Sequence, residues 1–197
     1  MADPVSDWTH RGGFAGLSRR IGSGEGLKAV ERAGLAAATV IARRGKAADA
    51  ATALGRMLGA PVVDGGKRTS GGDVTVLGTG PGTWLVFGDR PALVADLTAA
   101  LDGLAAVVDQ SDANAILDLS GPRLVDVLEK GLRLDLHPAA FAADDVAVTA
   151  IAHVGVTLWM SDDRATVTLA IPRSLAGSLL HWLEASARPV GLTVEAD

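Results

Sequence analysis

The order of apolar segments occurs twice along this chain, and that repetition limits the folds that it can adopt. A strand, a helix, a hairpin, a second helix and a closing strand are indicated from residue 34 onward, and the same order returns from residue 114. This order is typical of the split ferredoxin-like unit. We therefore expect an α+β fold of two tandem ferredoxin-like β-α-β-β-α-β units with antiparallel sheets.

The first ferredoxin-like unit is expected over residues 34–110, on the spacing of its apolar residues. A strand is predicted over 35–42, and a helix carrying Ala50, Leu54 and Met57 is predicted to end at Gly59. The remaining elements are a hairpin of 74–77 with 83–87, a helix after Pro91 carrying Leu93, Leu97 and Leu101, and a strand over 105–108.

The second unit is expected over residues 111–197, and we expect the two units to pack as one domain. The predicted elements are a strand over 114–119, a helix over 122–130, a hairpin of 154–160 with 165–171, a helix from Pro172 carrying Leu175, Leu179 and Leu183, and a strand over 190–194. Alternation along the hairpin predicts that Val167, Leu169 and Ile171 face the helices, while Thr166 and Thr168 face away.

Residues 1–33 show neither helical nor strand periodicity, so we expect an irregular N-terminal extension. This segment is rich in glycine, serine and charge, yet it contains Trp8 and Phe14. Large apolar side chains need a surface to cover them. Two interpretations stay open: these aromatic residues fold back on their own chain, or they dock onto another subunit.

Composition excludes several classes of protein. The net charge is −5, and clustered lysine and arginine of the kind that neutralises nucleic-acid phosphates is absent from the sequence. The chain has no cysteine, which excludes disulfides and thiolate metal sites. No apolar run approaches the roughly 20 residues of a membrane helix. We expect no nucleic-acid or membrane partner and a cytoplasmic location.

The sequence contains no recognisable catalytic, cofactor-binding or metal-binding set. His137, His153 and His181 lack the spacing of metal ligands on one helix. The glycine groups at 22–26 and 78–82 lack the strand before and the helix after that a phosphate loop requires. We therefore expect these histidines and glycines to be structural.

Several residues that are expected at the surface are candidates for contacts with a partner. His153 is expected on a strand face shared with Trp159, which is either solvated or covered by a partner. Arg123 and Arg173 lie at predicted helix starts, where the helix dipole disfavours cations. Either each arginine pairs locally, as Arg123 would with Asp109, Asp126 or Asp135, or both reach carboxylates on another chain.

Alternating leucines precede His137 and Pro138 in the segment Leu132-Arg133-Leu134-Asp135-Leu136-His137-Pro138. They predict a short extended run that pins the exit of the preceding helix to the sheet. Asp135 is expected to accept hydrogen bonds from nearby backbone amides, and a direct role of this segment in contacting a ligand or partner is the alternative.

The C-terminal half contains a set of short motifs: Val108-Asp109-Gln110-Ser111, Leu117 to Arg123 (LDLSGPR), Asp126-Val127-Leu128 with Lys130-Gly131, Arg133 to Pro138 (RLDLHP), Ile151 to Leu158 (IAHVGVTL), and Ile171-Pro172-Arg173-Ser174 followed by Leu180-His181-Trp182-Leu183. With these motifs the chain resembles the gamma subunits of heterotetrameric sarcosine oxidase. Asp109-Gln110-Ser111 and Ser120-Gly121-Pro122 are also similar to motifs of the folate-binding T-protein of the glycine cleavage system.

The resemblance implies a T-protein-like fold and a non-catalytic subunit of a complex that oxidatively demethylates sarcosine to glycine. It also implies alpha, beta and delta subunits as partners, which carry FAD, FMN, NAD, zinc and tetrahydrofolate, with no cofactor in this chain. The resulting hypothesis is a subunit that assists assembly and supports the folate-handling part of the complex. Its alternative is a free-standing, folate-dependent aminomethyltransferase-like enzyme.

Overall fold

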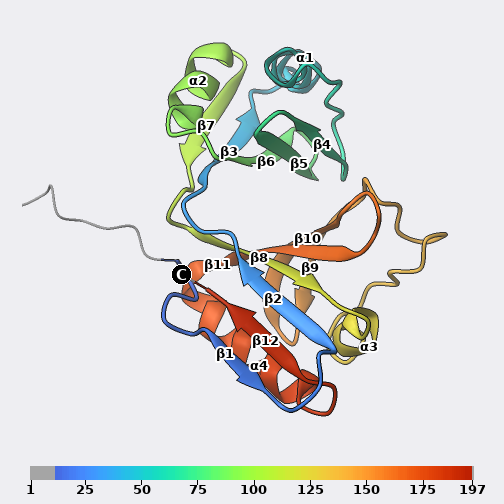
Figure 1. Ribbon diagram of the computed structural model, residues 1–197. Coiled ribbons are helices and arrows are strands. Elements are labelled where there is room, and N and C mark those ends of the chain that lie inside the picture. Colours follow the sequence, from blue (N-terminus) through green and yellow to red (C-terminus); the bar gives the residue numbers. More distant parts are fainter. Residues whose placement is uncertain (1–11, 197) are drawn as a thin grey trace, which may run out of the picture.

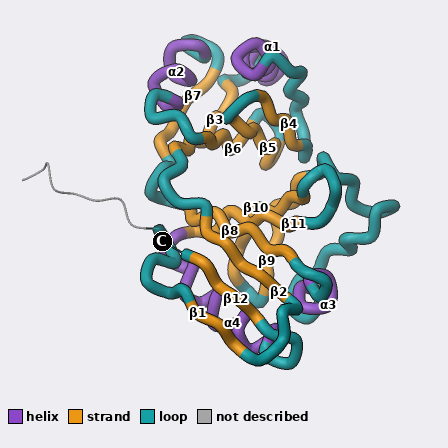
Figure 2. Tube along the Cα trace, viewed as in Figure 1, coloured by secondary structure: helices purple, strands orange, loops and turns teal. Residues whose placement is uncertain are grey.

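The computed structural model describes residues 12–196, which form four layers (Figure 1). Helices α1 (Ala47–Leu58) and α2 (Leu93–Ala100) cover the outer face of one sheet. Helices α3 (Leu124–Leu128) and α4 (Ala176–Ala187) pack on the outer side of the other sheet. Figure 2 shows the strands of both sheets between these helical layers. This architecture agrees with the expected α+β class.

The first sheet contains five antiparallel strands in the order β4-β5-β6-β3-β7. Four of them, β5-β6-β3-β7, follow the strand order of a ferredoxin-like unit, and β4 is added at the edge. The strands are β3 (Ala36–Ala42), β4 (Arg68–Gly71), β5 (Val74–Gly80), β6 (Thr83–Gly88) and β7 (Ala105–Asp109). The strand β4 was not predicted from the sequence.

The helices of this unit follow their apolar spacing. The three leucines predicted for α2 (Leu93, Leu97 and Leu101) are all fully buried. Gly59 ends α1 in a left-handed conformation, with φ +69°, and its N–H donates a hydrogen bond to the Gly55 carbonyl. This is the glycine cap that the sequence predicted.

The second sheet contains seven strands in the order β1-β12-β2-β8-β11-β10-β9. Its strands are β1 (Arg19–Ile21), β2 (Leu27–Glu31), β8 (Asn114–Ser120), β9 (Val146–Ile151), β10 (Val154–Met160), β11 (Thr166–Pro172) and β12 (Leu192–Glu195). Strand β9 was not predicted from the sequence. Val167, Leu169 and Ile171 face the helices, as predicted, and are fully buried among them.

The expectation of an irregular N-terminal extension is wrong for the part that the structure describes. Strand β2 lies between β8 and β12, antiparallel to the first and parallel to the second. Leu27 and Ala29 are buried in the second core, whereas Lys28 between them is exposed. This alternation was present in the sequence, but it is too short to be distinguished from a loop without its two neighbouring strands.

Glycines allow the N-terminal segment to approach the end of the chain. The Gly26 N–H donates to the Val190 carbonyl at 2.9 Å, and the Leu27 N–H donates to the Gly191 carbonyl at 3.1 Å. A Cβ atom on Gly24 would lie 2.2 Å from the Val190 carbonyl oxygen. The glycine group at 22–26 therefore serves close backbone packing, not phosphate binding.

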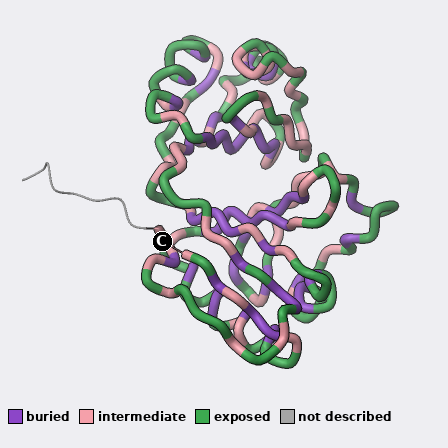
Figure 3. Tube along the Cα trace, in the orientation of Figure 1, coloured by how far each residue is buried: buried purple, intermediate pink, exposed green. Residues whose placement is uncertain are grey.

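The two sheets pack against each other through a small apolar cluster. It contains four residues of the first sheet and three of the second: Ala37, Leu77, Leu85, Phe87, Ile116, Trp159 and Ala170. Figure 3 shows buried positions along the strands that face this layer.

Thr168 faces away from the helices, as predicted, but it is buried and donates a hydrogen bond to Asp118 at 2.7 Å.

Two helix boundaries differ from the prediction. The helix expected over 122–130 is α3, which ends at Leu128, because the Lys130 and Gly131 N–H groups donate to carbonyls only three residues earlier. Pro172 ends β11 and is followed by a 3₁₀ turn (Arg173–Leu175) before α4 begins. Leu175 is consequently partly exposed and does not join the core.

Replacing Gly191 should destabilise the fold. Its φ of +88° is unfavourable for other residues, and a Cβ would lie 1.9 Å from the Gly24 carbonyl oxygen. Gly191→Ala is expected to lower the free energy of unfolding by about 2 kcal/mol or more, measured by urea denaturation. Gly177→Ala, in α4 with open space around it, is the control and should be neutral or stabilising. Equal stability of both variants would contradict the packing argument.

An ion-pair cluster between the units should make stability depend on pH. The Lys67 ammonium lies 2.7 Å from Asp145 and 3.0 Å from Asp144, and its hydrogen bond lowers the pKa of Asp145. A carboxyl whose pKa is lower in the folded state stabilises the fold at pH values above its ordinary, unfolded-state pKa. This contribution is lost as the pH falls through the folded-state pKa.

Lys67→Met should therefore destabilise the chain near neutral pH, and the difference from the parent should shrink below about pH 4. Urea denaturation across this pH range measures the effect. Lys46→Met is the control, because the Lys46–Asp49 pair lies within one helical turn and is exposed. A difference in the free energy of unfolding between Lys67→Met and the parent that does not change with pH would contradict the role assigned to the Lys67–Asp145 ion pair.

Candidate functional site

Phe14 is part of the core of the second unit and is not a docking residue. Its side chain is fully buried in the cluster beneath the seven-stranded sheet. Its backbone N–H donates to both carboxylate oxygens of Glu31 at 3.2 Å, which fixes this segment beside β2. The interpretation that Phe14 folds back on its own chain is therefore confirmed, and its proposed contact with a partner is corrected. Trp8 lies outside the described residues.

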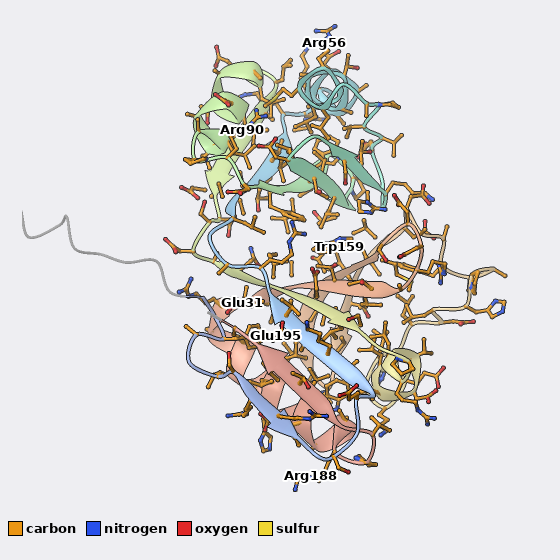
Figure 4. The ribbon with its side chains drawn as sticks, in the orientation of Figure 1. Glu31, Arg56, Arg90, Trp159, Arg188 and Glu195 are labelled. Atoms are coloured by element: carbon orange, nitrogen blue, oxygen red, sulfur yellow. The ribbon has the colours of Figure 1, made fainter. Side chains whose placement is uncertain are left out.

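Trp159 is also unavailable for a partner, because the other sheet covers it. Only 4% of the residue is exposed, and its ring centroid lies 5.4 Å from that of Phe87 at an interplanar angle of 42°. The Arg32 guanidinium lies 5.7 Å from the Phe87 ring. Figure 4 shows Trp159 between the two sheets. The sequence analysis had proposed that this sheet face is either solvated or covered by a partner. At Trp159 the first unit of the same chain covers it.

The two helix-start arginines each form an ion pair within the chain. The Arg123 guanidinium lies 2.7 Å from Asp126, three residues later, so the local-pairing interpretation is confirmed. The Arg173 guanidinium lies 3.6 Å from Asp112. Both pairs are partly exposed, and contacts of these arginines with another chain stay a prediction.

His137 stabilises a turn. Its backbone N–H donates to Asp135 at 2.8 Å, as predicted for that carboxylate, and its Nδ1 accepts a hydrogen bond from the Ala139 N–H at 3.2 Å. Leu132 and Leu136 are buried in the core, which confirms that the leucines pin this segment. His137 is exposed, and its role toward a partner is a prediction that this geometry leaves untested.

The Asp109-Gln110-Ser111 motif ties the two units together. Ser111 donates to Asp109 through its N–H at 2.9 Å and its hydroxyl at 2.7 Å, and these hydrogen bonds lower the pKa of Asp109. The Ser111 hydroxyl also accepts the Ala37 N–H at 3.0 Å, and the Gln110 N–H donates to the Ala37 carbonyl at 2.8 Å. This motif therefore performs a structural task at the connection between β7 and β8.

His153 occupies a strained two-residue turn between β9 and β10. Ile151 pairs directly with Val154, and the two residues between them, Ala152 and His153, have φ values of +46° and +74°. Two positive φ angles in a two-residue hairpin are typical of a type I′ turn, in which asparagine and glycine are preferred. The expectation that His153 lies on a strand face shared with Trp159 is therefore wrong. The sequence missed this turn because β9 was not predicted.

A wide groove opens beside this turn, with a volume of about 860 Å³. We call it the α3–β9 groove and define it by six of its lining residues: Glu129, Lys130, Gly131, Arg133, His153 and Trp182. These residues come from the end of α3, the segment after it, the hairpin turn and α4. The groove brings together His153 and Arg133, which belongs to the Leu132–Pro138 segment left open to a partner, with Glu129, Lys130 and Trp182. The sequence had not proposed these last three residues as partner contacts.

Within residues 12–196, no group of three or more histidine, aspartate or glutamate side chains has the arrangement of a metal site. None of the helices in this range is both long and apolar enough to cross a membrane. The second glycine group belongs to the β5–β6 hairpin, where a Cβ on Gly78 would lie 1.6 Å from the Gly65 carbonyl oxygen. This glycine group therefore serves close packing.

Replacing His153 by glycine should stabilise the chain. Glycine adopts positive φ angles without the penalty that other residues incur there. His153→Gly is expected to raise the free energy of unfolding by about 1 kcal/mol in urea denaturation. Ala150→Gly, in the neighbouring strand β9, is the control and should lower it. A loss of stability in His153→Gly would show that its side chain makes contacts that outweigh the strain.

The sequence is similar to the members of one protein family. The sequence model described as "Sarcosine oxidase, gamma subunit family" matches residues 44–188. The sarcosine oxidase subunit gamma of Arthrobacter sp is 32% identical over 173 residues, covering 85% of this chain and 84% of that protein. The corresponding subunit of Corynebacterium sp. (strain P-1) is 38% identical over 111 residues, and this match spans only 54% of that protein's length.

Two solved structures are similar in fold. A chain of the heterotetrameric sarcosine oxidase from Corynebacterium sp. U-96, in complex with pyrrole 2-carboxylate, superposes with a TM-score of 0.80 and 24% identity, covering 91% of this chain and 95% of that one. The glycine cleavage system aminomethyltransferase T from Bartonella henselae gives a TM-score of 0.62 and 12% identity over 88% of this chain but only 48% of that protein. The T-protein-like fold expected from the sequence is thereby confirmed.

Proposed function

Because the chain belongs to the sarcosine oxidase gamma subunit family, we propose that it is a non-catalytic subunit of a heterotetrameric sarcosine oxidase. In this proposal it assembles with alpha, beta and delta subunits in the cytoplasm. FAD, FMN, NAD, zinc and tetrahydrofolate are bound by those subunits, and the complex demethylates sarcosine oxidatively to glycine. The observation that carries the proposal is the family match over residues 44–188.

The polar side chains that the sequence analysis named as candidates have structural partners within the chain. This favours a structural role for the subunit. Asp109 is held by Ser111, Arg123 by Asp126, and the imidazole of His137 by a backbone amide. These contacts shape turns and helix starts. A subunit that supplies a stable surface to its neighbours needs this kind of internal bonding.

We further propose that residues 34–110 and 111–197 act as two ferredoxin-like units of one T-protein-like domain, which buttresses the folate-handling part of the complex. The sheet-to-sheet cluster around Phe87 and Trp159 supports a joint action of the units. The aminomethyltransferase alternative is not favoured, because the matching curated relatives are sarcosine oxidase gamma subunits, whereas the likeness to aminomethyltransferase T is one of fold.

Co-expression tests the proposal. The four subunits are expressed together, with an affinity tag on the alpha subunit, and in parallel without the gamma chain. We expect the gamma chain to co-purify in stoichiometric amount and its omission to reduce the yield of intact, flavin-loaded complex. Assembly and sarcosine turnover that are unchanged without the gamma chain would contradict the proposal.

Tetrahydrofolate titration of the isolated chain addresses the alternative. A non-catalytic subunit is expected to show no saturable binding in calorimetry, while the assembled complex binds. Saturable micromolar binding by the chain alone would favour the aminomethyltransferase-like enzyme.

A further inference from the structure

The α3–β9 groove has a fixed backbone framework. The Ala152 N–H donates to the Gly131 carbonyl at 3.2 Å, and Leu132 forms an isolated antiparallel bridge with Ile151. Leu132 and Ile151 are both buried in the second core. The segment after α3 is therefore fastened to the end of β9, so the groove is present before anything binds in it.

Backbone strain holds an imidazole at one wall of this groove. Ala152 and His153 both adopt positive φ angles, which cost about 1–2 kcal/mol for each residue that is not glycine. His153 is exposed, and no hydrogen bond or ion pair of its side chain occurs within the described part of the chain. Within residues 12–196, no hydrogen bond or ion pair of the imidazole offsets this strain, and strained residues of this kind occur at binding sites.

The same groove carries cations that have no carboxylate partner within residues 12–196. The Lys130 ammonium donates to the Ser186 carbonyl at 2.6 Å, and the Arg133 guanidinium forms no ion pair in this range. Glu129 supplies the single carboxylate of the lining. Two cations and an imidazole therefore line the groove together with one carboxylate, in a chain whose net charge is −5.

An indole completes the lining. Trp182, from α4, lies so close to Gly131 that a Cβ there would be 2.6 Å from the ring. Its ring is partly exposed, and its N–H has no hydrogen-bond acceptor among the residues described. A partly exposed tryptophan whose N–H has no acceptor among the described residues is typical of contact surfaces that combine apolar packing with one hydrogen bond.

We infer that the α3–β9 groove is the docking site for an extended acidic segment of another subunit of the assembly. Charge complementarity selects this occupant: a carboxylate of the segment accepts hydrogen bonds from Arg133 and His153, and a neighbouring apolar side chain packs on Trp182. The groove volume of about 860 Å³ accommodates several side chains. The inference rests on the proposed function and specifies where one partner contacts this chain.

Charge reversal at Arg133 tests the site. In the complex purified through the alpha subunit, Arg133→Glu is expected to weaken retention of the gamma chain at least about tenfold, measured as its dissociation constant in a salt series. Arg133→Lys should retain most of the affinity. Arg44→Glu is the matched control, because Arg44 is exposed, forms no ion pair among the described residues and lies in the other unit.

His153→Gly separates docking from folding. It is expected to raise the stability of the isolated chain but to weaken its association about tenfold, since the turn relaxes while a contact is lost. A merely structural residue would change both quantities in the same direction. Unchanged affinity in both Arg133→Glu and His153→Gly would overturn the inference.

Zero-length carbodiimide coupling identifies the occupant. In the complex containing Arg133→Lys, the introduced amine is expected to couple to an aspartate or glutamate of another subunit, located by mass spectrometry. Coupling only within the gamma chain would overturn the inference. Free glutamate that fails to displace any subunit in a competition experiment would overturn it as well. If the parent gamma chain fails to associate at all, the proposed function fails. If it associates, and Arg133→Glu and His153→Gly both associate equally well, only the docking site fails.

Discussion

Face-to-face packing of the two sheets is the contact on which the rest of this structure depends. Each sheet has helices on one face only, so its other face would expose apolar side chains to water. Phe87 and Trp159 meet in that layer, with Leu77, Leu85 and Ile116 around them. At one end the Asp109–Ser111 turn binds to Ala37, and Lys67 pairs with Asp145 elsewhere along the contact. Burial of this face therefore joins two repeated units into one body.

The N-terminal strands add a second constraint, because they belong to the sheet that is furthest from them in sequence. The chain forms β2 within the second sheet, crosses to build the whole first sheet, and returns at β8 beside β2. Strand β2 supplies Leu27 and Ala29 to the second core, and the glycines at 24, 26 and 191 let the backbones meet. The second unit is therefore complete only when both ends of the chain are in place, whereas the first is built from one continuous segment.

The interaction surface differs more from its sequence prediction than the fold does. Large aromatic residues were reasonable docking candidates, yet Phe14 and Trp159 are buried, because a chain with few aromatics uses them in its cores. The α3–β9 groove instead combines charged side chains with a strained turn and an indole from α4. Arg133 and Trp182 are 49 positions apart in the sequence, and no local pattern indicates that they share a groove. Of its lining, the sequence had proposed partner contacts only for His153 and, as an alternative, for the segment that contains Arg133.

By itself the sequence determined the elements whose signals are local. Four-residue leucine steps defined α2, Gly59 defined the end of α1, alternation defined both hairpins, and the doubled order of elements indicated ferredoxin-like units. The C-terminal motifs also identified the family. Tertiary structure alone decided the insertion of β2, the edge strands β1, β4 and β9, and the lining of the groove. Short strands obtain most of their stability from hydrogen bonds and contacts with neighbours distant in sequence, so their own residues carry too little information to predict them.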